Sequence, residues 1–132
     1  MNGVFLDAVG LIALWNRRDQ WHEAAGSAFA GIASGESLVT TSYIIGECGN
    51  AFSRSEIRTL LIDLTERLDA DGTLIFPSDA DWHEAWMAFR SAPPGSAGLI
   101  DQLSFAVMRR LGLRCAFTND RHFADAGFET MF

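Results

Sequence analysis

Short apolar runs alternate along this chain with longer segments in which apolar residues recur every three or four positions. Short runs of this kind predict strands that are buried on both faces, and the longer period predicts helices with one buried face. The predicted strands cover residues 4–6, 38–40, 73–76, 114–117 and 129–132. Strands that alternate with helices predict an α/β fold, here an α/β/α sandwich with a short, mainly parallel central sheet.

The predicted helices connect these strands. They cover residues 9–15, 19–29, 42–52, 56–68, 79–89 and 99–111. Ser42 is expected to cap the third helix, and Gly112 is expected to end the last one. Pro93-Pro94-Gly95 predicts a loop between the last two helices. After the fourth strand we expect only a short turn before the final strand.

Length and composition narrow the class of protein. The 132 residues are 48% hydrophobic and 20% charged, which suits one globular domain over residues 1–132 and excludes disorder and fibrous repeats. The apolar stretch at residues 4–15 is interrupted by Asp7 and has no basic residue before it. We therefore expect neither a secretory signal nor a membrane span, and a cytoplasmic protein.

The cysteine and lysine content removes several kinds of chemistry. Cys48 and Cys115 form no CxxC pair, so we expect reduced, buried thiols and neither a disulfide framework nor a zinc site. All ten basic residues are arginine. A P-loop and a Schiff-base enzyme each need a lysine, so both are excluded. Chemistry based on carboxylates, histidine, hydroxyl groups or metal ions remains.

The formal net charge of −7 argues against broad electrostatic adhesion to nucleic acid, which depends on clustered positive charge. Divalent cations held by carboxylates would reverse this charge locally. The net charge alone therefore does not decide whether the protein acts on nucleic acid.

Four acidic residues occupy unusual positions. Asp7 directly follows the first strand, and Asp120 comes three residues after the fourth. Glu47 and Asp101 lie in mostly apolar helices. Each acid alone could be a helix cap or a turn residue. As a set, partly buried carboxylates repel one another unless a cation neutralises them, and oxygen ligands favour Mg²⁺ or Mn²⁺ over zinc.

Four segments contain these acids: residues 5–7, 41–47, 99–108 and 117–123. In order and spacing they resemble the PIN-domain family, and most closely its VapC-like toxin ribonucleases. The resemblance covers nearly the whole chain. Its most specific parts are the sequences DQLSFAVMRRLG, which begins at Asp101, and TNDRHF, which begins at Thr118.

This resemblance implies a PIN-like fold and an endoribonuclease that depends on Mg²⁺ or Mn²⁺. Such an enzyme would be the toxin of a toxin–antitoxin pair and would cleave RNA phosphodiester bonds with a metal-activated water. By motif position, the catalytic and metal-binding acids would be Asp7, Glu47, Asp101 and Asp120. The family is usually dimeric and pairs with a small antitoxin that occludes the active site, so we expect a homodimer and a small protein partner.

Other residues in these motifs have two interpretations. Thr118 and Ser104 carry hydroxyl groups where the family often has them, and each could support the metal ligands or be an ordinary strand-end or helix residue. Arg121 and His122 could contact RNA or form a structural turn. His22 and His83 are distant in sequence from the proposed ligands and are expected to be surface or half-buried helix residues.

A departure from the family pattern leaves a second function open. The first motif reads Asp7-Ala8-Val9, so a hydroxyl that the family usually has near the metal is absent. The alternative is thus a catalytically weakened PIN-like module that acts through a protein partner. Trp15, Trp21 and Trp86 are expected to be exposed and available for contacts with other proteins. An aspartyl phosphatase is disfavoured, because the chain lacks both lysine and a DxD motif after the first strand.

Overall fold

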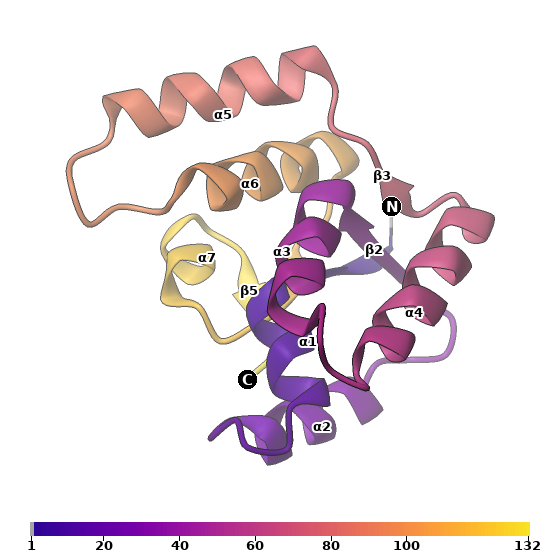
Figure 1. Ribbon diagram of the computed structural model, residues 1–132. Coiled ribbons are helices and arrows are strands. Elements are labelled where there is room, and N and C mark those ends of the chain that lie inside the picture. Colours follow the sequence, from indigo (N-terminus) through magenta and orange to yellow (C-terminus); the bar gives the residue numbers. More distant parts are fainter. Residues whose placement is uncertain (1) are drawn as a thin grey trace.

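The computed structural model describes residues 2–132, and its centre is a five-stranded sheet. The strand order is β3-β2-β1-β4-β5, and all four neighbouring pairs are parallel (Figure 1). The strands are β1 (Gly3–Leu6), β2 (Ser37–Thr41), β3 (Leu74–Ile75), β4 (Cys115–Phe117) and β5 (Glu129–Thr130). The predicted α/β fold with a short parallel sheet is therefore confirmed.

Seven helices connect the strands of this described region. They are α1 (Ala8–Trp15), α2 (His22–Ala30), α3 (Ser42–Phe52), α4 (Arg58–Asp71), α5 (Asp79–Ser91), α6 (Leu99–Leu111) and α7 (Arg121–Asp125). Parallel strands are joined by right-handed crossovers, so the reversal of strand order at β1 places α1–α4 on one face of the sheet and α6 and α7 on the other. Helix α5 lies on the outer side of α6 (Figure 1).

Successive side chains of a strand point to opposite faces of the sheet, so apolar strands form a core on both faces. Phe5 contacts Phe123 of α7, with ring centroids 6.4 Å apart, whereas Phe117 contacts Phe29 of α2 at 5.4 Å. Phe5, Phe117 and Phe123 are fully buried. Because β1 lies at the centre of the sheet, both of its faces are covered, which explains why its sequence is continuously apolar.

The register of the sheet brings two distant segments together. Leu6, the last residue of β1, is paired with Phe117, the last residue of β4. The next residues, Asp7 and Thr118, therefore leave the sheet side by side at the carboxyl ends of adjacent strands. In open parallel sheets this edge is where ligands bind.

Gly10 allows α1 to lie close to β4. A Cβ atom at this position would lie 2.0 Å from the Phe117 carbonyl oxygen, well inside the contact distance of the two atoms. Only glycine permits this approach without moving the helix or the strand. Gly10 thus helps to set the position of Asp7, which immediately precedes α1.

Several predicted boundaries were wrong for local reasons. Helix α2 begins at His22 because the Asp19 carboxylate accepts a 2.8 Å hydrogen bond from the Trp21 backbone N–H and forms a turn first. Thr41, and not Ser42, caps α3 by accepting a hydrogen bond from the Ile44 N–H at 3.2 Å. Helix α4 is shifted to Arg58–Asp71.

The end of the chain also differs from the prediction. Where a turn was expected, the structure has the short helix α7, and the final strand covers only Glu129–Thr130. The side chain of Asp120 caps α7 by accepting a hydrogen bond from the His122 N–H at 2.9 Å. A helix of five residues shows too little periodicity to be read from the sequence.

The expectations for individual side chains were mostly confirmed. Trp21 and Trp86 are exposed, but Trp15 is half-buried and contacts Phe52 of α3 with ring centroids 6.3 Å apart. Both cysteines are free thiols, and Cys48 is buried as expected, but Cys115 is only half-buried because it lies at the start of β4. Across residues 2–132 no helix is long and apolar enough to cross a membrane.

Candidate metal centre

Asp7 is a buried carboxylate at the edge of the sheet where β1 and β4 end. Its side chain is 2% exposed, and its Oδ2 atom accepts a 2.8 Å hydrogen bond from the Thr118 hydroxyl. Although Asp7 stands at the start of α1, its side chain forms no capping hydrogen bond there, and only the adjacent Ala8 backbone contributes a hydrogen bond that lowers its pKa. The carboxylate is therefore held mainly by Thr118 at the end of β4 and is not used as a cap.

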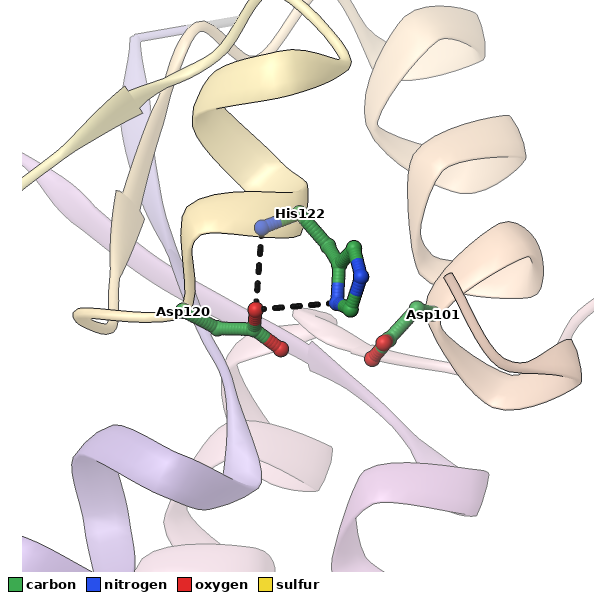
Figure 2. A group of neighbouring side chains, drawn as sticks. All are labelled: Asp101, Asp120 and His122. Atoms are coloured by element: carbon green, nitrogen blue, oxygen red, sulfur yellow. Dashed lines mark hydrogen bonds and ion pairs between the residues drawn. The ribbon is translucent and has the colours of Figure 1, made fainter. Parts of the chain in front are cut away.

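Thr118 links Asp7 to a second acid. Its hydroxyl oxygen accepts a 3.1 Å hydrogen bond from the Asp120 backbone N–H while donating to Asp7. Asp120 in turn lies 3.2 Å from Nδ1 of His122 (Figure 2). A continuous chain of contacts thus runs from the end of β1 through the end of β4 into α7.

Asp101 reaches the same place from the other side. It lies in the first turn of α6, and Figure 2 shows its carboxylate pointing toward Asp120 and His122. One ligand atom from each of these three residues lies within 4.8 Å of the other two. The group is half-buried and joins α6 to the loop that precedes α7.

The electrostatics confirm that the acids are close enough to repel one another. Burial, followed by the charges of Asp101 and Asp120, raises the pKa of Asp7 to about 7, against the opposing hydrogen bond from Thr118. Burial and the charge of Asp120 raise the pKa of Asp101, while His122 and the Gly98 backbone lower it.

Glu47 is the most exposed of the four predicted acids and lies outside the group in Figure 2. Partial desolvation of its carboxyl and the charge of Asp101 raise its pKa, so its side chain still faces the same negative region. The neighbouring thiol of Cys48 is buried, and burial with the charges of Asp7 and Glu47 raises its pKa to about 12. The negative potential therefore extends into the core.

No arginine neutralises these acids in the part of the chain that the structure describes. Arg110 is committed elsewhere, to Asp81 in α5. Ser104, one helical turn after Asp101, is buried, and its hydroxyl oxygen has no hydrogen-bond partner among residues 2–132. Crowded carboxylates without an arginine partner form a donor set that fits a hard divalent cation.

The residues that were predicted to support the metal ligands or to contact RNA differ in how they meet the acids. Thr118 contacts Asp7 directly, whereas no contact joins the Ser104 hydroxyl to the acids. Val9 is exposed on α1 and offers no hydroxyl. His122, predicted only as an RNA contact, stands within the acid group, and its position two residues after Asp120 was the available indication in the sequence.

A pocket of about 520 Å³ adjoins the acid group on the α7 side. Its lining includes His122, Arg121 and Arg109, together with the loop around Gly95, whose carbonyl oxygen is 3.2 Å from Nε2 of His122. Arg109 also lies over the rings of Phe105 and Phe128. This pocket brings the side chains of Arg109 and Arg121 beside His122 of the acid group.

His22 and His83 lie away from this centre. His22 is half-buried, with its Nδ1 atom 2.9 Å from the Ala13 carbonyl oxygen. His83 is exposed on α5. Neither belongs to the acid group, and their positions agree with the expectation of surface or half-buried helix residues.

Comparison with known proteins gives the same picture of the fold. The structure resembles VapC20 of Mycobacterium tuberculosis, described as a sarcin–ricin-loop-cleaving toxin, with a TM-score of 0.80 and 23% identity over 96% of both chains. It also resembles FitAcB from Neisseria gonorrhoeae, with a TM-score of 0.66 and 12% identity over 98% of this chain and 96% of the other. A search of curated protein sequences found no match. A family model described as "PIN domain" matches residues 4–129, and the chain therefore belongs to the PIN-domain family.

Proposed function

We propose that this protein is a metal-dependent endoribonuclease and the toxin component of a toxin–antitoxin pair. The observation that carries the proposal is the group of mutually repelling carboxylates, without an arginine partner, that gathers beside the carboxyl ends of β1 and β4. The resemblance to VapC20, itself described as an RNA-loop-cleaving toxin, supports the same chemistry.

Asp7, Asp101, Asp120 and Glu47 are the residues that would hold Mg²⁺ or Mn²⁺. A bound divalent cation would lower the pKa of a water molecule and neutralise charge on the scissile phosphate. Thr118 orients the carboxylate of Asp7 through its 2.8 Å hydrogen bond. The buried Ser104 hydroxyl, one helical turn after Asp101, has no hydrogen-bond partner among residues 2–132. No protein nucleophile is needed for this reaction.

RNA would enter beside α7. Arg121, His122 and Arg109 line the adjoining pocket and can offer hydrogen bonds and positive charge to phosphate oxygens. A nuclease of net charge −7 must concentrate its attraction for RNA at such a site, because the rest of its surface repels a polyanion.

A cleavage assay tests the proposed activity. Purified protein is incubated with total cellular RNA and with Mg²⁺, Mn²⁺ or EDTA, and the ends of the products are mapped. We expect discrete cuts that require metal and disappear in Asp101→Asn. Asp63→Asn, which changes an exposed acid in α4, is the matched control and should cut normally. Full activity in folded Asp101→Asn would refute the assignment.

The proposed partner is a small antitoxin protein that covers the metal centre and blocks RNA. The absent hydroxyl at Val9 favours a second candidate, a PIN-like module with weakened turnover that acts through this partner. Calorimetric titration with Mn²⁺, combined with the cleavage assay, separates the two. A module of the second kind would bind the metal without cutting any RNA in the cleavage assay.

A further inference from the structure

A pocket of about 520 Å³ lies between α6, α7 and the loop at residues 94–97. We call it the α7 pocket. It borders the metal centre, because His122 both lines the pocket and belongs to the acid group. Pockets that bind small ligands have volumes of about 300–1,000 Å³. The α7 pocket therefore has the size to hold a single nucleotide beside the acids.

The deepest part of the α7 pocket is apolar. Ala97 and Phe105 are 8% and 2% exposed, and Ala126 is half-buried. Phe105 is held in place by Phe123, with ring centroids 4.9 Å apart and the two rings nearly perpendicular. A phosphate gains nothing by covering such a floor, whereas the flat face of an unstacked nucleobase leaves water there. The floor therefore favours a base as the occupant.

The loop beside the pocket is held in shape by its own contacts. The Ser96 N–H donates a 3.2 Å hydrogen bond to the Pro93 carbonyl oxygen, and Gly95 has a φ of 89°, which suits glycine alone. The Gly95 carbonyl oxygen lies 3.2 Å from Nε2 of His122, whose Nδ1 lies 3.2 Å from Asp120 (Figure 2). The imidazole thus stands between the loop and the acids. A preformed wall lowers the conformational cost of binding.

Helix α7 presents two opposite charges to the pocket, and they do not neutralise each other. Arg121 and Asp125 are four residues apart, so they are neighbours on the helix surface. Both are exposed, and neither forms an ion pair in the part of the chain that the structure describes. A carboxylate only accepts hydrogen bonds and a guanidinium only donates them. Both kinds of group are therefore open to a ligand.

Helix α6 adds an amide and a second guanidinium. Gln102, Phe105 and Arg109 recur at intervals of three and four residues, and all three line the pocket. The Gln102 amide can donate and accept hydrogen bonds. The Arg109 guanidinium lies 6.0 and 5.6 Å from the ring centroids of Phe105 and Phe128, and these cation–π contacts hold it at the rim. Its charge suits the phosphate next to a bound base.

The charged groups of α7 match the pairing edge of guanine. Guanine has two adjacent N–H donors, at N1 and at the exocyclic N2, which one carboxylate can accept together. Adenine, cytosine and uracil each have a single donor nitrogen on this edge. Guanine also has acceptors at O6 and N7, the atoms that arginine typically contacts. Asp125 therefore suits the donors of this base, and Arg121 suits its acceptors.

We propose that the α7 pocket binds an unpaired guanine of the RNA beside the phosphate that is cleaved. Asp125 and Arg121 would bind the edge of the base, and Arg109 would bind a flanking phosphate. The pocket would give the proposed nuclease, on whose function this proposal rests, a preference for guanine at one position. A paired guanine has its edge covered and its faces stacked, so the pocket selects single-stranded RNA such as a loop.

The first experiment measures binding without cleavage. Asp101→Asn in EDTA is titrated against fluorescent uridine oligomers that carry one central guanine, adenine, cytosine or hypoxanthine, and anisotropy gives the dissociation constants. We expect the guanine oligomer to bind about tenfold more tightly than those with adenine or cytosine, as for a bidentate base contact. Hypoxanthine lacks the N2 amino group and should lose most of this advantage.

Substitutions in the same Asp101→Asn background locate the contact with the base. Asp125→Asn should reduce the preference for guanine to about twofold or less, because one of the two acceptor oxygens becomes a donor. Asp63→Asn changes an exposed acid in α4 and should keep the full preference. Circular dichroism verifies that each variant is folded.

Arg109 is tested in the cleavage reaction with Mn²⁺. Arg109→Met removes the charge but keeps a side chain that can pack on the rings, so KM should rise about tenfold at low salt with little change in kcat. Arg114→Met removes an exposed arginine just before β4 and is the matched control. Mapped product ends should lie beside guanine with the wild type, and Asp125→Asn should lose this preference.

The outcomes separate the pocket from the nuclease function. Equal affinity for all the oligomers, a preference for another base, or a guanine preference that survives Asp125→Asn would overturn the proposal. Metal-dependent cuts without guanine beside them would also overturn it, while the nuclease function would stand. Absence of any cleavage, together with guanine binding that Asp125→Asn abolishes, would refute the nuclease and support the pocket as a guanine site.

Discussion

At the scale of single residues, Asp7 shows how burial and function oppose each other. Its carboxyl has an ordinary pKa of 3.8 and a pKa of about 7 in the folded, metal-free protein. Between these values the folded state holds a proton that the unfolded chain has released. The free energy of unfolding therefore falls as the pH rises from about 4 to 7, and the penalty is fully present above 7.

Asp7→Asn should remove this penalty. In EDTA at pH 8 we expect the variant to be more stable than the wild type by on the order of 2 kcal/mol. The difference in pKa corresponds to about 4 kcal/mol, from which the unpartnered amide of asparagine subtracts. At pH 4, where most of this penalty is absent, the variant should instead be the less stable protein by roughly 1–2 kcal/mol, because the cost of the unpartnered amide remains. Urea denaturation at both pH values measures this, and a wild type that is the more stable at pH 8 would contradict the assigned pKa.

At the scale of helices and strands, the contact between α1 and β4 positions Asp7 beside Thr118. Gly10 makes this contact possible, because a Cβ atom there would lie 2.0 Å from the Phe117 carbonyl oxygen. Backbone atoms on both sides leave no flexible group to move aside. A side chain at position 10 would therefore have to displace the whole of helix α1.

Gly10→Ala should destabilise the fold by roughly 2–3 kcal/mol, in the range of overpacking in a close-packed core. Gly26→Ala is the matched control, because its Cβ atom would meet nothing within 4 Å in α2, and alanine should stabilise that helix by up to about 1 kcal/mol. Thermal unfolding of both variants gives the comparison. Equal melting temperatures would mean that α1 has room to move away from β4.

The attachment of α5 to α6 depends on Arg110 and Asp81. Arg110 lowers the pKa of the buried Asp81 carboxyl, so its stabilisation is present above the ordinary pKa of 3.8 and is lost as the pH falls through the lowered value. Arg110→Gln should cost roughly 1–3 kcal/mol at pH 7, because it leaves a carboxylate that is 3% exposed without its partner. The cost should shrink below pH 4. Hydrogen exchange of the α5 amides would report the loosening, and unchanged exchange would mean that apolar packing alone holds the helix.

At the scale of the whole molecule, repulsion among the crowded acids lowers the stability of the metal-free protein, and a bound cation offsets this repulsion. With Mn²⁺ at a hundred times its dissociation constant, the wild type should gain about 2.7 kcal/mol of stability if the unfolded chain does not bind. Asp101→Asn should gain much less, although it should be the more stable protein in EDTA because one repulsion is removed.

Differential scanning fluorimetry of the two proteins, each with EDTA and with Mn²⁺, makes this comparison. Asp63→Asn serves as the control and should respond to the metal like the wild type. A wild type that is more stable than Asp101→Asn in EDTA and does not respond to Mn²⁺ would mean that these acids are dispersed structural residues.

Periodicity and motif order were enough to predict most of the fold. Apolar runs such as residues 4–6 must be strands covered on both faces, and the prediction of the α/β sheet was confirmed. The wrong predictions of helix boundaries arose where alternative local hydrogen bonds compete. Thr41 and Ser42 offer equivalent hydroxyls, and only the backbone path out of β2 selects Thr41 as the cap. Helix α7 depends on its cap by Asp120, which the sequence presents equally well as a turn.

What the sequence determined by itself was the set of acids and the resemblance that groups them; their roles as metal ligands remain a prediction. Tertiary structure alone decided their electrostatics, because a pKa depends on burial and on distances between residues far apart in the chain. Asp7 and Thr118 are 111 positions apart and meet through a 2.8 Å hydrogen bond. Tyr43 of α3 and Trp82 of α5 meet in the same way, with ring centroids 6.3 Å apart only once the tertiary fold brings the two helices together. Neither distance is encoded in the local sequence, because both follow from the order of the strands.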